Sequence, residues 1–197
     1  MNQDRPSDAE LVAATQAGDP QAFGMLVERH QERLFNILLR VLGNADDASD
    51  VLQDAFVKAY TKLDSFRGSS KFFTWMYRVA LNLACSHHRK TRRRRTETSI
   101  DAMKSNVGQE PIDLDGSPDE RMLQAEQAEA VQVALLQLSD AHRQILVLRE
   151  MEDCSYETIA EILEVPVGTV RSRLYRARLQ MKDLLASPAL SQIEQNN

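Results

Sequence analysis

The sequence contains little cysteine and no long apolar run, and these absences exclude several classes of protein. Only two cysteines occur in 197 residues, Cys85 and Cys154, and they lie far apart in the chain, so we expect no disulfide framework. No apolar stretch approaches the roughly 20 residues of a membrane-spanning helix, and the N-terminus has no signal-peptide core. We therefore expect a cytoplasmic protein without membrane insertion.

The sequence also offers few residues at metal-ligand spacing and no recognisable group of catalytic residues. Cys85 and His88 have the spacing of half a zinc site, but no second pair with ligand spacing follows. His30 and His142 are isolated, and no nucleophile, base and orienting group suggest a catalytic set. The sequence therefore predicts no metal site, no cofactor and no enzymatic activity.

Strand-like alternation of apolar and polar residues is also rare, whereas helical spacing recurs along the chain. The predicted fold is all-α. Ser7 is the expected N-cap of the first helix, and Gly43 is expected to close the second. Helices are expected at residues 8–17, then from about 20 to 42, 45–63, 71–94, 118–138, 140–151, 156–163 and 166–185.

The composition changes abruptly after Thr96 and predicts two domains. Residues 97–117 contain no aromatic side chain, carry one lysine against five acidic residues, and include helix-interrupting glycine and proline, which is typical of a flexible linker. This acidic linker would join two small helical domains, residues 7–96 and 118–186. The polar tail, residues 187–197, is expected to be disordered.

Charge is distributed unevenly around a net charge of -5. Residues 1–96 carry 15 Lys or Arg against 11 Asp or Glu, and residues 118–197 carry 8 against 13. Residues 171–182, however, hold five positive charges and no negative one. Because nucleic-acid binding depends on a local basic surface, overall acidity does not argue against it. Acidity elsewhere predicts weak binding to free DNA, as in a subunit of a larger complex.

The segment 155–178 has the pattern of two helices around a tight turn. Apolar stripes at helical spacing can pack the two helices together, with Ile159 on the first and Leu174 on the second. This layout is typical of a DNA-reading helix-turn-helix. A solvated basic face on an ordinary helix pair is the alternative. The candidate DNA-binding residues on the second helix are Thr169, Arg171, Ser172, Arg173, Tyr175, Arg176 and Arg178.

An acidic face is predicted on the helix at residues 45–63. Asp47, Asp50 and Asp54 recur at spacings of three and four, with Gln53 beside them. Stabilisation of the helix dipole explains acidic residues in the first turn only. Asp50 and Asp54 lie too far along the helix for that effect, so they indicate a surface for a basic partner.

Aromatic residues are concentrated in one place. Six of the eleven in the chain fall between Tyr60 and Tyr77, around a glycine-containing loop and ahead of the basic run 87–95. Some of them must belong to the core. Basic charge beside stacking surfaces also favours binding of single-stranded nucleic acid, where each stacked base contributes about 1–3 kcal/mol. That energy is comparable to the few kcal/mol needed to unstack a base.

Four segments in the right order and separation resemble bacterial sigma factors of the extracytoplasmic-function group, within the sigma-70 family: residues 50–60, 64–68, 73–82 and 165–178. The resemblance extends over about residues 10–185. It implies a sigma2-like helical bundle and a sigma4-like helix-turn-helix domain. It also implies a sigma factor that binds core RNA polymerase and directs promoter-specific initiation of transcription.

The resemblance assigns roles along the chain. The first domain would bind a coiled coil of the largest polymerase subunit through Asp50, Gln53, Asp54, Phe56 and Val57. The helix at 167–181 would read the -35 element, and the flap region of the polymerase would be a further contact. A separate anti-sigma factor commonly holds members of this group inactive. The -10 element would be recognised, and its melted non-template strand trapped, by Phe66, Arg67, Ser69, Lys71, Phe72, Phe73, Trp75, Arg78 and Asn82.

Two other classes of protein compete with this hypothesis. A stand-alone helix-turn-helix regulator would account for residues 155–178, but it leaves the acidic helix, the aromatic loop and the basic run without a purpose. A helical adaptor that binds only proteins is the other alternative. The resemblance gives no role to Arg92–Arg95.

Overall fold

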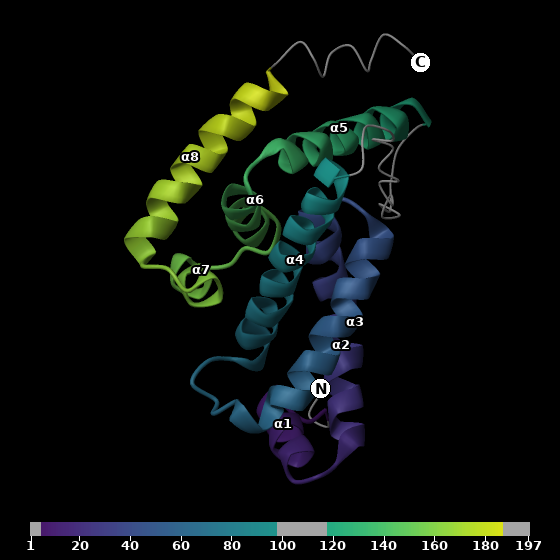
Figure 1. Cartoon of the computed structure of the whole chain (residues 1–197), viewed down its shortest axis with the longest axis vertical. Coiled ribbons are helices and arrows are strands. Elements are labelled where there is room, and N and C mark those ends of the chain that lie inside the picture. Colours follow the sequence, from purple (N-terminus) through teal and green to yellow (C-terminus); the bar gives the residue numbers. More distant parts are fainter. Residues whose placement is uncertain (1–4, 98–117, 187–197) are drawn as a thin grey trace.

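The computed structural model describes residues 5–97 and 118–186, and every regular element in these two ranges is helical, which confirms the predicted all-α class (Figure 1). The predicted linker, apart from Glu97, and the predicted tail lie outside the described residues. The elements are α1 (Asp8–Gln16), α2 (Pro20–Leu42), α3 (Ala45–Lys62), η1 (Leu63–Ser65), α4 (Phe72–Glu97), α5 (Pro118–Gln137), α6 (Asp140–Leu146), η2 (Val147–Met151), α7 (Tyr156–Leu163) and α8 (Val167–Leu185).

The helix ends follow from local chemistry. Ser7 caps α1 in a capping box, with its backbone N–H and its hydroxyl each 2.7 Å from the Glu10 carboxylate. Gly43 closes α2 with φ at 73°, a left-handed conformation that favours glycine. A Cβ at this position would also lie 2.5 Å from Cδ1 of Leu136. The backbone conformation therefore favours glycine here, and a larger residue would also displace the Leu136 side chain of α5.

One predicted helix is divided in the structure. The segment expected as a single helix at 140–151 is α-helical as far as Leu146 and then widens into a π-helical turn, η2. The backbone N–H of Glu152 accordingly bonds to the carbonyl of Val147, five residues back, at 3.2 Å. Apolar periodicity over five residues does not distinguish the two helix types. The wide turn brings Glu150 and Glu152 into contact with other elements, as described below.

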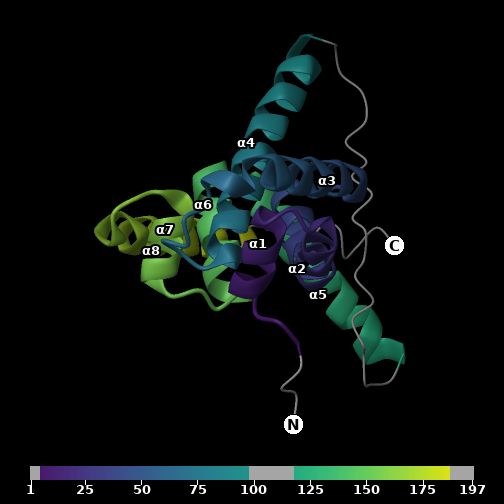
Figure 2. The same ribbon diagram turned by 90° about the horizontal axis from the view of Figure 1, so that it is seen from below.

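The apolar face predicted for α2 forms the centre of the first domain. Leu26, Leu34, Ile37 and Leu38 are completely buried between α1, α3 and α4. In the second domain, α6 and α8 pack together, and α7 lies across α8. Both domains contribute to one continuous apolar cluster, because α2 and α4 also contact α5, α6 and α7. Figure 2 shows that one end of α4 and one end of α5 project from this body in different directions.

A buried arginine joins the two domains. Arg143 is only 2% exposed. Its guanidinium donates to the carbonyls of Leu135, Leu136 and Leu138 at the end of α5, at 2.9, 2.9 and 3.0 Å, and to that of Val41 in α2 at 2.6 Å. These carbonyls belong to the last turns of two helices, which lack partners of their own. One side chain thus satisfies the ends of two helices from different domains.

Candidate nucleic-acid interface

α7 and α8 form the helix-turn-helix that the sequence predicts. Ser155 caps α7 by accepting from the N–H of Thr158 at 3.1 Å. The turn passes through Glu164 in the left-handed conformation, and Pro166 is the N-cap of α8 rather than its first residue. The apolar stripes meet as expected, with Ile159, Val170, Leu174 and Ala177 buried. Ile162, which the sequence pattern did not single out, is buried with them.

The outer face of α8 is open to solvent. Arg171, Ser172 and Arg176 are exposed, and Tyr175 is the most exposed large hydrophobic residue of α8, at 71%. Thr169 and Arg173 are half-buried at the edges of the helix. A helix with exposed arginines and a tyrosine on its first turns can reach base edges in a major groove.

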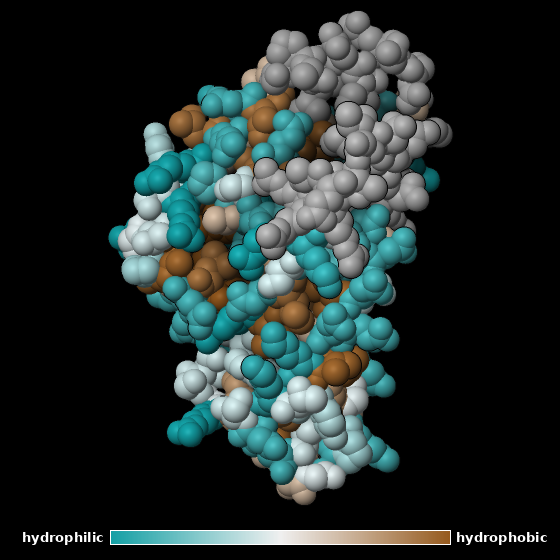
Figure 3. All heavy atoms as spheres, viewed as in Figure 1, coloured by the Kyte–Doolittle hydropathy of each residue, from teal (hydrophilic) through white to brown (hydrophobic). Residues whose placement is uncertain are grey.

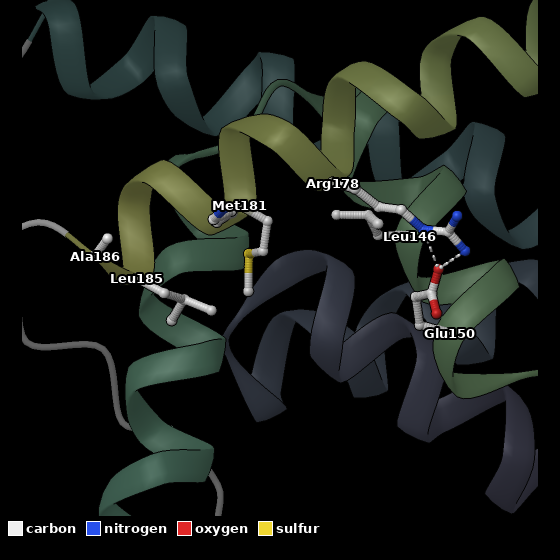
Figure 4. A pocket seen from close by; sticks show the side chains of 7 residues that line it. Leu146, Glu150, Arg178, Met181, Leu185 and Ala186 are labelled. Atoms are coloured by element: carbon white, nitrogen blue, oxygen red, sulfur yellow. Dashed lines mark hydrogen bonds and ion pairs between the residues drawn. The ribbon is translucent and has the colours of Figure 1, made fainter.

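Arg178 differs from the other arginines of α8. Its Nη2 and Nε lie 2.6 and 2.9 Å from Oε1 of Glu150 in η2 (Figure 4). This hydrogen bond to Glu150 is the main reason that the pKa of Arg178 is raised. Arg178 borders an open apolar groove between α8 and the α6–η2 segment, which also includes Leu146, Met181, Leu185 and Ala186. The guanidinium therefore turns back toward its own domain.

The acidic face of α3 is exposed as predicted. Asp50, Gln53, Asp54 and Val57 all lie on the solvent side of the helix. Phe56 is on the opposite side, only 8% exposed, and its ring lies edge-on to that of Phe23, with centroids 6.4 Å apart. A partner that binds this face would meet the first four side chains directly, whereas Phe56 holds the helix in place.

The predicted -10 residues surround the loop before α4. The side-chain amide of Gln16 fixes this loop by donating to the carbonyls of Leu63 and Phe66, at 2.8 and 3.1 Å. The Phe66 ring packs against Trp75, with centroids 5.2 Å apart. Phe72 is buried beneath them. Phe66, Phe73, Trp75 and Arg78 are half-buried, and the exposed members of the set are Arg67, Ser69, Lys71 and Asn82.

A further cluster on this side of the molecule joins two of the predicted -10 residues to side chains that the sequence patterns did not single out. The guanidinium of Arg33 in α2 lies 4.4 Å from the ring centroid of Phe73. Its Nε donates to the Glu152 carboxylate at 2.6 Å, and the Tyr77 hydroxyl donates to the same oxygen at 3.1 Å. Next to it, Arg78 contacts Glu164 at 3.2 Å. We call Arg33, Tyr77 and Arg78 the α2–α4 cradle.

The electrostatics of the cradle reflect its burial and its charges. Burial raises the pKa of Tyr77, and the negative charge of Glu152 raises it further. For Arg33, burial acts to lower the pKa, but the hydrogen bond to Glu152 and nearby negative charge raise it overall. At neutral pH Arg33 therefore remains a cation and Tyr77 a neutral hydroxyl that acts as a donor.

The surface around these sites is mainly polar. Figure 3 shows hydrophilic side chains over most of the visible face, with apolar residues in small separate areas between them. Within the two described ranges, no group of three or more His, Cys, Asp or Glu side chains is arranged to hold a metal ion. None of the helices in those ranges is long and apolar enough to cross a membrane.

Comparison with known proteins identifies the same two regions. The family model described as Sigma-70 region 2 matches residues 26–94, and that described as Sigma-70, region 4 matches residues 128–181. The RNA polymerase sigma-H factor of Pseudomonas aeruginosa is 40% identical over 173 residues, covering 87% of this chain and 90% of that protein. The ECF RNA polymerase sigma-E factor of Haemophilus influenzae is 41% identical over 175 residues, covering 87% and 92%.

Two solved structures have a similar fold. The structure of CnrH in complex with the cytosolic domain of CnrY has a TM-score of 0.64 and 28% identity, covering 90% of this chain and 96% of that chain. The sigma factor RpoE of Bartonella quintana, in complex with the anti-sigma factor NepR, has a TM-score of 0.66 and 25% identity, covering 83% and 96%.

Proposed function

Because the chain belongs to the extracytoplasmic-function group of sigma-70 family sigma factors, it directs bacterial RNA polymerase to promoters, and we propose how its residues divide this task. It binds core RNA polymerase and promoter DNA. We place it in the cytoplasm as a recognition subunit without chemistry of its own. A stand-alone helix-turn-helix regulator is not favoured, because the similarity extends through both domains.

The observation that carries this assignment is the presence of three separate exposed surfaces on one chain. They are the acidic face of α3, the aromatic loop with the start of α4, and the outer face of α8. A promoter-recognition subunit needs one surface for the polymerase and two for DNA. A regulator or an adaptor would need only one or two of them.

We assign the exposed face of α3, formed by Asp50, Gln53, Asp54 and Val57, to the coiled coil of the largest polymerase subunit. Acidic side chains at such an interface would steer association with a basic partner and make it sensitive to salt. Phe56 supports this face from within the core. The apolar groove beside Met181 and Leu185 is our candidate for the flap region.

We assign the loop and the first half of α4 to the -10 element. Arg67, Ser69, Lys71 and Asn82 are exposed and can contact the strand directly. The half-buried rings, Phe66 among them, can accept unstacked bases at their exposed edges. A base that leaves the duplex would then gain a stacking partner and nearby positive charge.

We assign α8 to the -35 element. Arg171, Ser172, Tyr175 and Arg176 are the candidates for base contacts, because they lie exposed on the first turns. Arg178 is the candidate for a phosphate contact. Its pair with Glu150 is exposed on both sides, and exposed pairs contribute about 0–1 kcal/mol, so a phosphate could replace the carboxylate.

The structural neighbours also suggest a regulator. CnrH and RpoE were each solved with a bound protein, and NepR is described as an anti-sigma factor. We propose that this chain likewise has an anti-sigma partner, which would hold it away from the polymerase.

The function is tested by reconstitution. The full chain, bacterial core polymerase and a library of promoter sequences are mixed, and the transcripts are sequenced. Transcription from a subset that shares -10 and -35 sequences is the expected result, with none from core alone. If the chain never stimulated core but bound a palindromic duplex by itself, the stand-alone regulator would be correct.

A further inference from the structure

Two carboxylates of the second domain occupy cationic positions on the first. Glu152, from the segment after η2, accepts from Arg33 and Tyr77 at 2.6 and 3.1 Å. Glu164, in the turn of the helix-turn-helix, contacts Arg78 at 3.2 Å. The partners of each contact lie 75 to 119 residues apart in the chain. The α2–α4 cradle is thus a set of donors that faces anions supplied by another domain.

The two arginines of the cradle are partly accessible to an anion from solvent. The Arg33 side chain is 51% exposed although Glu152 is only 11% exposed, so the cation meets solvent on the side away from its partner. The Arg78 side chain is 30% exposed and contacts Glu164 through Nη1 at 3.2 Å. An arginine fork binds phosphate in much the same geometry as carboxylate. The donors could therefore hold a phosphate wherever the carboxylates are absent.

The position of the cradle indicates where that phosphate comes from. Tyr77 and Arg78 lie on α4 between Trp75 and Asn82, within the segment assigned to the melted -10 strand. Arg33 covers the face of Phe73, another member of that segment. A single strand whose bases stack on the loop aromatics would carry its phosphates close to these cations. The backbone of single-stranded DNA is therefore the anion that fits this position.

We propose that Arg33, Tyr77 and Arg78 bind the phosphate backbone of the melted non-template strand, and that Glu152 and Glu164 fill this site in the free protein. The inference rests on the proposed function. It assigns a DNA contact to Arg33, which lies outside the residues that the sequence assigned to the -10 element. It also makes strand binding and docking of the second domain mutually exclusive. The free chain then binds single strands weakly until the domains separate.

The test measures binding by the full chain to a labelled single-stranded oligonucleotide. The oligonucleotide is the non-template -10 strand of a promoter that the wild-type holoenzyme opens, and fluorescence anisotropy follows binding. Glu152→Gln keeps the size of the side chain but removes the charge that competes with phosphate. We expect affinity to rise about two- to fivefold, as expected for release of a weak competing ion pair. Glu161→Gln, at an exposed position on α7, is the matched control and should leave affinity unchanged.

Arg33→Gln separates phosphate binding from a purely structural role. If Arg33 only docked the domains, its replacement would free the site and raise affinity, as Glu152→Gln does. If Arg33 binds phosphate, affinity falls, and the slope of log affinity against log salt decreases by about 0.7. The gain from Glu152→Gln should also shrink in the Arg33→Gln background. Circular dichroism confirms that each variant is folded.

Two results would overturn the proposal: higher affinity in Arg33→Gln, or wild-type affinity in both Arg33→Gln and Glu152→Gln. Failure of the proposed function would look different. In that case the wild-type holoenzyme would open no promoter at all. If it opens promoters normally while the cradle variants change nothing, the sigma-factor assignment stands and the cradle alone is wrong.

Discussion

Replacing Arg143 should destabilise the protein more than any surface substitution. The side chain makes four hydrogen bonds of 2.6 to 3.0 Å to backbone carbonyls and is only 2% exposed. Burial lowers the pKa of Arg143, yet arginine starts so high that it stays charged. Arg143→Met keeps much of the volume but removes every donor. Each buried carbonyl left without a partner costs about 1–3 kcal/mol, partly relieved by water.

We therefore expect Arg143→Met to lose about 3–5 kcal/mol of unfolding free energy. Urea unfolding followed by far-UV circular dichroism measures this loss. Arg143→Lys is the informative companion, because it keeps the charge but lacks the planar fork. It should fall between the wild type and Arg143→Met. A loss below about 1 kcal/mol for Arg143→Met would refute the claim that these bonds hold the ends of α2 and α5.

Three predictions concern the proposed contacts. Reversing charge at Asp50 and Asp54 together should weaken binding to core polymerase at low salt and make the remaining binding less sensitive to salt, because salt screens the new repulsion; unchanged pull-down at low salt would contradict the α3 assignment. Phe66→Ala should leave closed complexes nearly intact but reduce permanganate reactivity of the melted strand, and undiminished reactivity in the folded variant would exclude a role in opening. In promoter selection, Arg171→Ala should cost about 1–3 kcal/mol and relax one -35 position, whereas Arg178→Ala should weaken all sequences equally and lower the salt slope by about one. If instead Arg178→Ala relaxed one -35 position and Arg171→Ala weakened all sequences equally, Arg178 would be the base-reading residue and Arg171 the phosphate contact.

Local sequence chemistry predicted the helices well. Ser7 and Gly43 mark helix ends because their side chain or backbone freedom acts within a few residues. The apolar stripes that join α7 to α8 were also visible, since periodicity encodes which side of a helix is buried. The exposure of Asp50 and Asp54 follows from the same periodicity, because the apolar residues of α3 occupy the other side.

Contacts between distant segments were not predictable in the same way. No local pattern links Arg33 to Glu152, which lie 119 residues apart. Phe56 was included in the polymerase-binding set because the resemblance concerns a segment, although the apolar spacing places it on the other flank of α3, where its ring packs against Phe23. The pair of Arg178 with Glu150, 28 residues away, likewise has no local signal in the sequence.

The acidity of the second domain gains a physical meaning from these contacts. The sequence alone predicts only that this acidity weakens the attraction between the protein and free DNA through its net charge. In the structure, three of its carboxylates lie directly against arginines that we assign to DNA: Glu150 on Arg178, Glu152 on Arg33 and Glu164 on Arg78. Each pair lowers the free positive charge that a phosphate would meet. Suppression of DNA binding depends on how close the carboxylates lie to the DNA-binding arginines. The net charge of a segment does not contain this information, so it understates how strongly DNA binding can be suppressed.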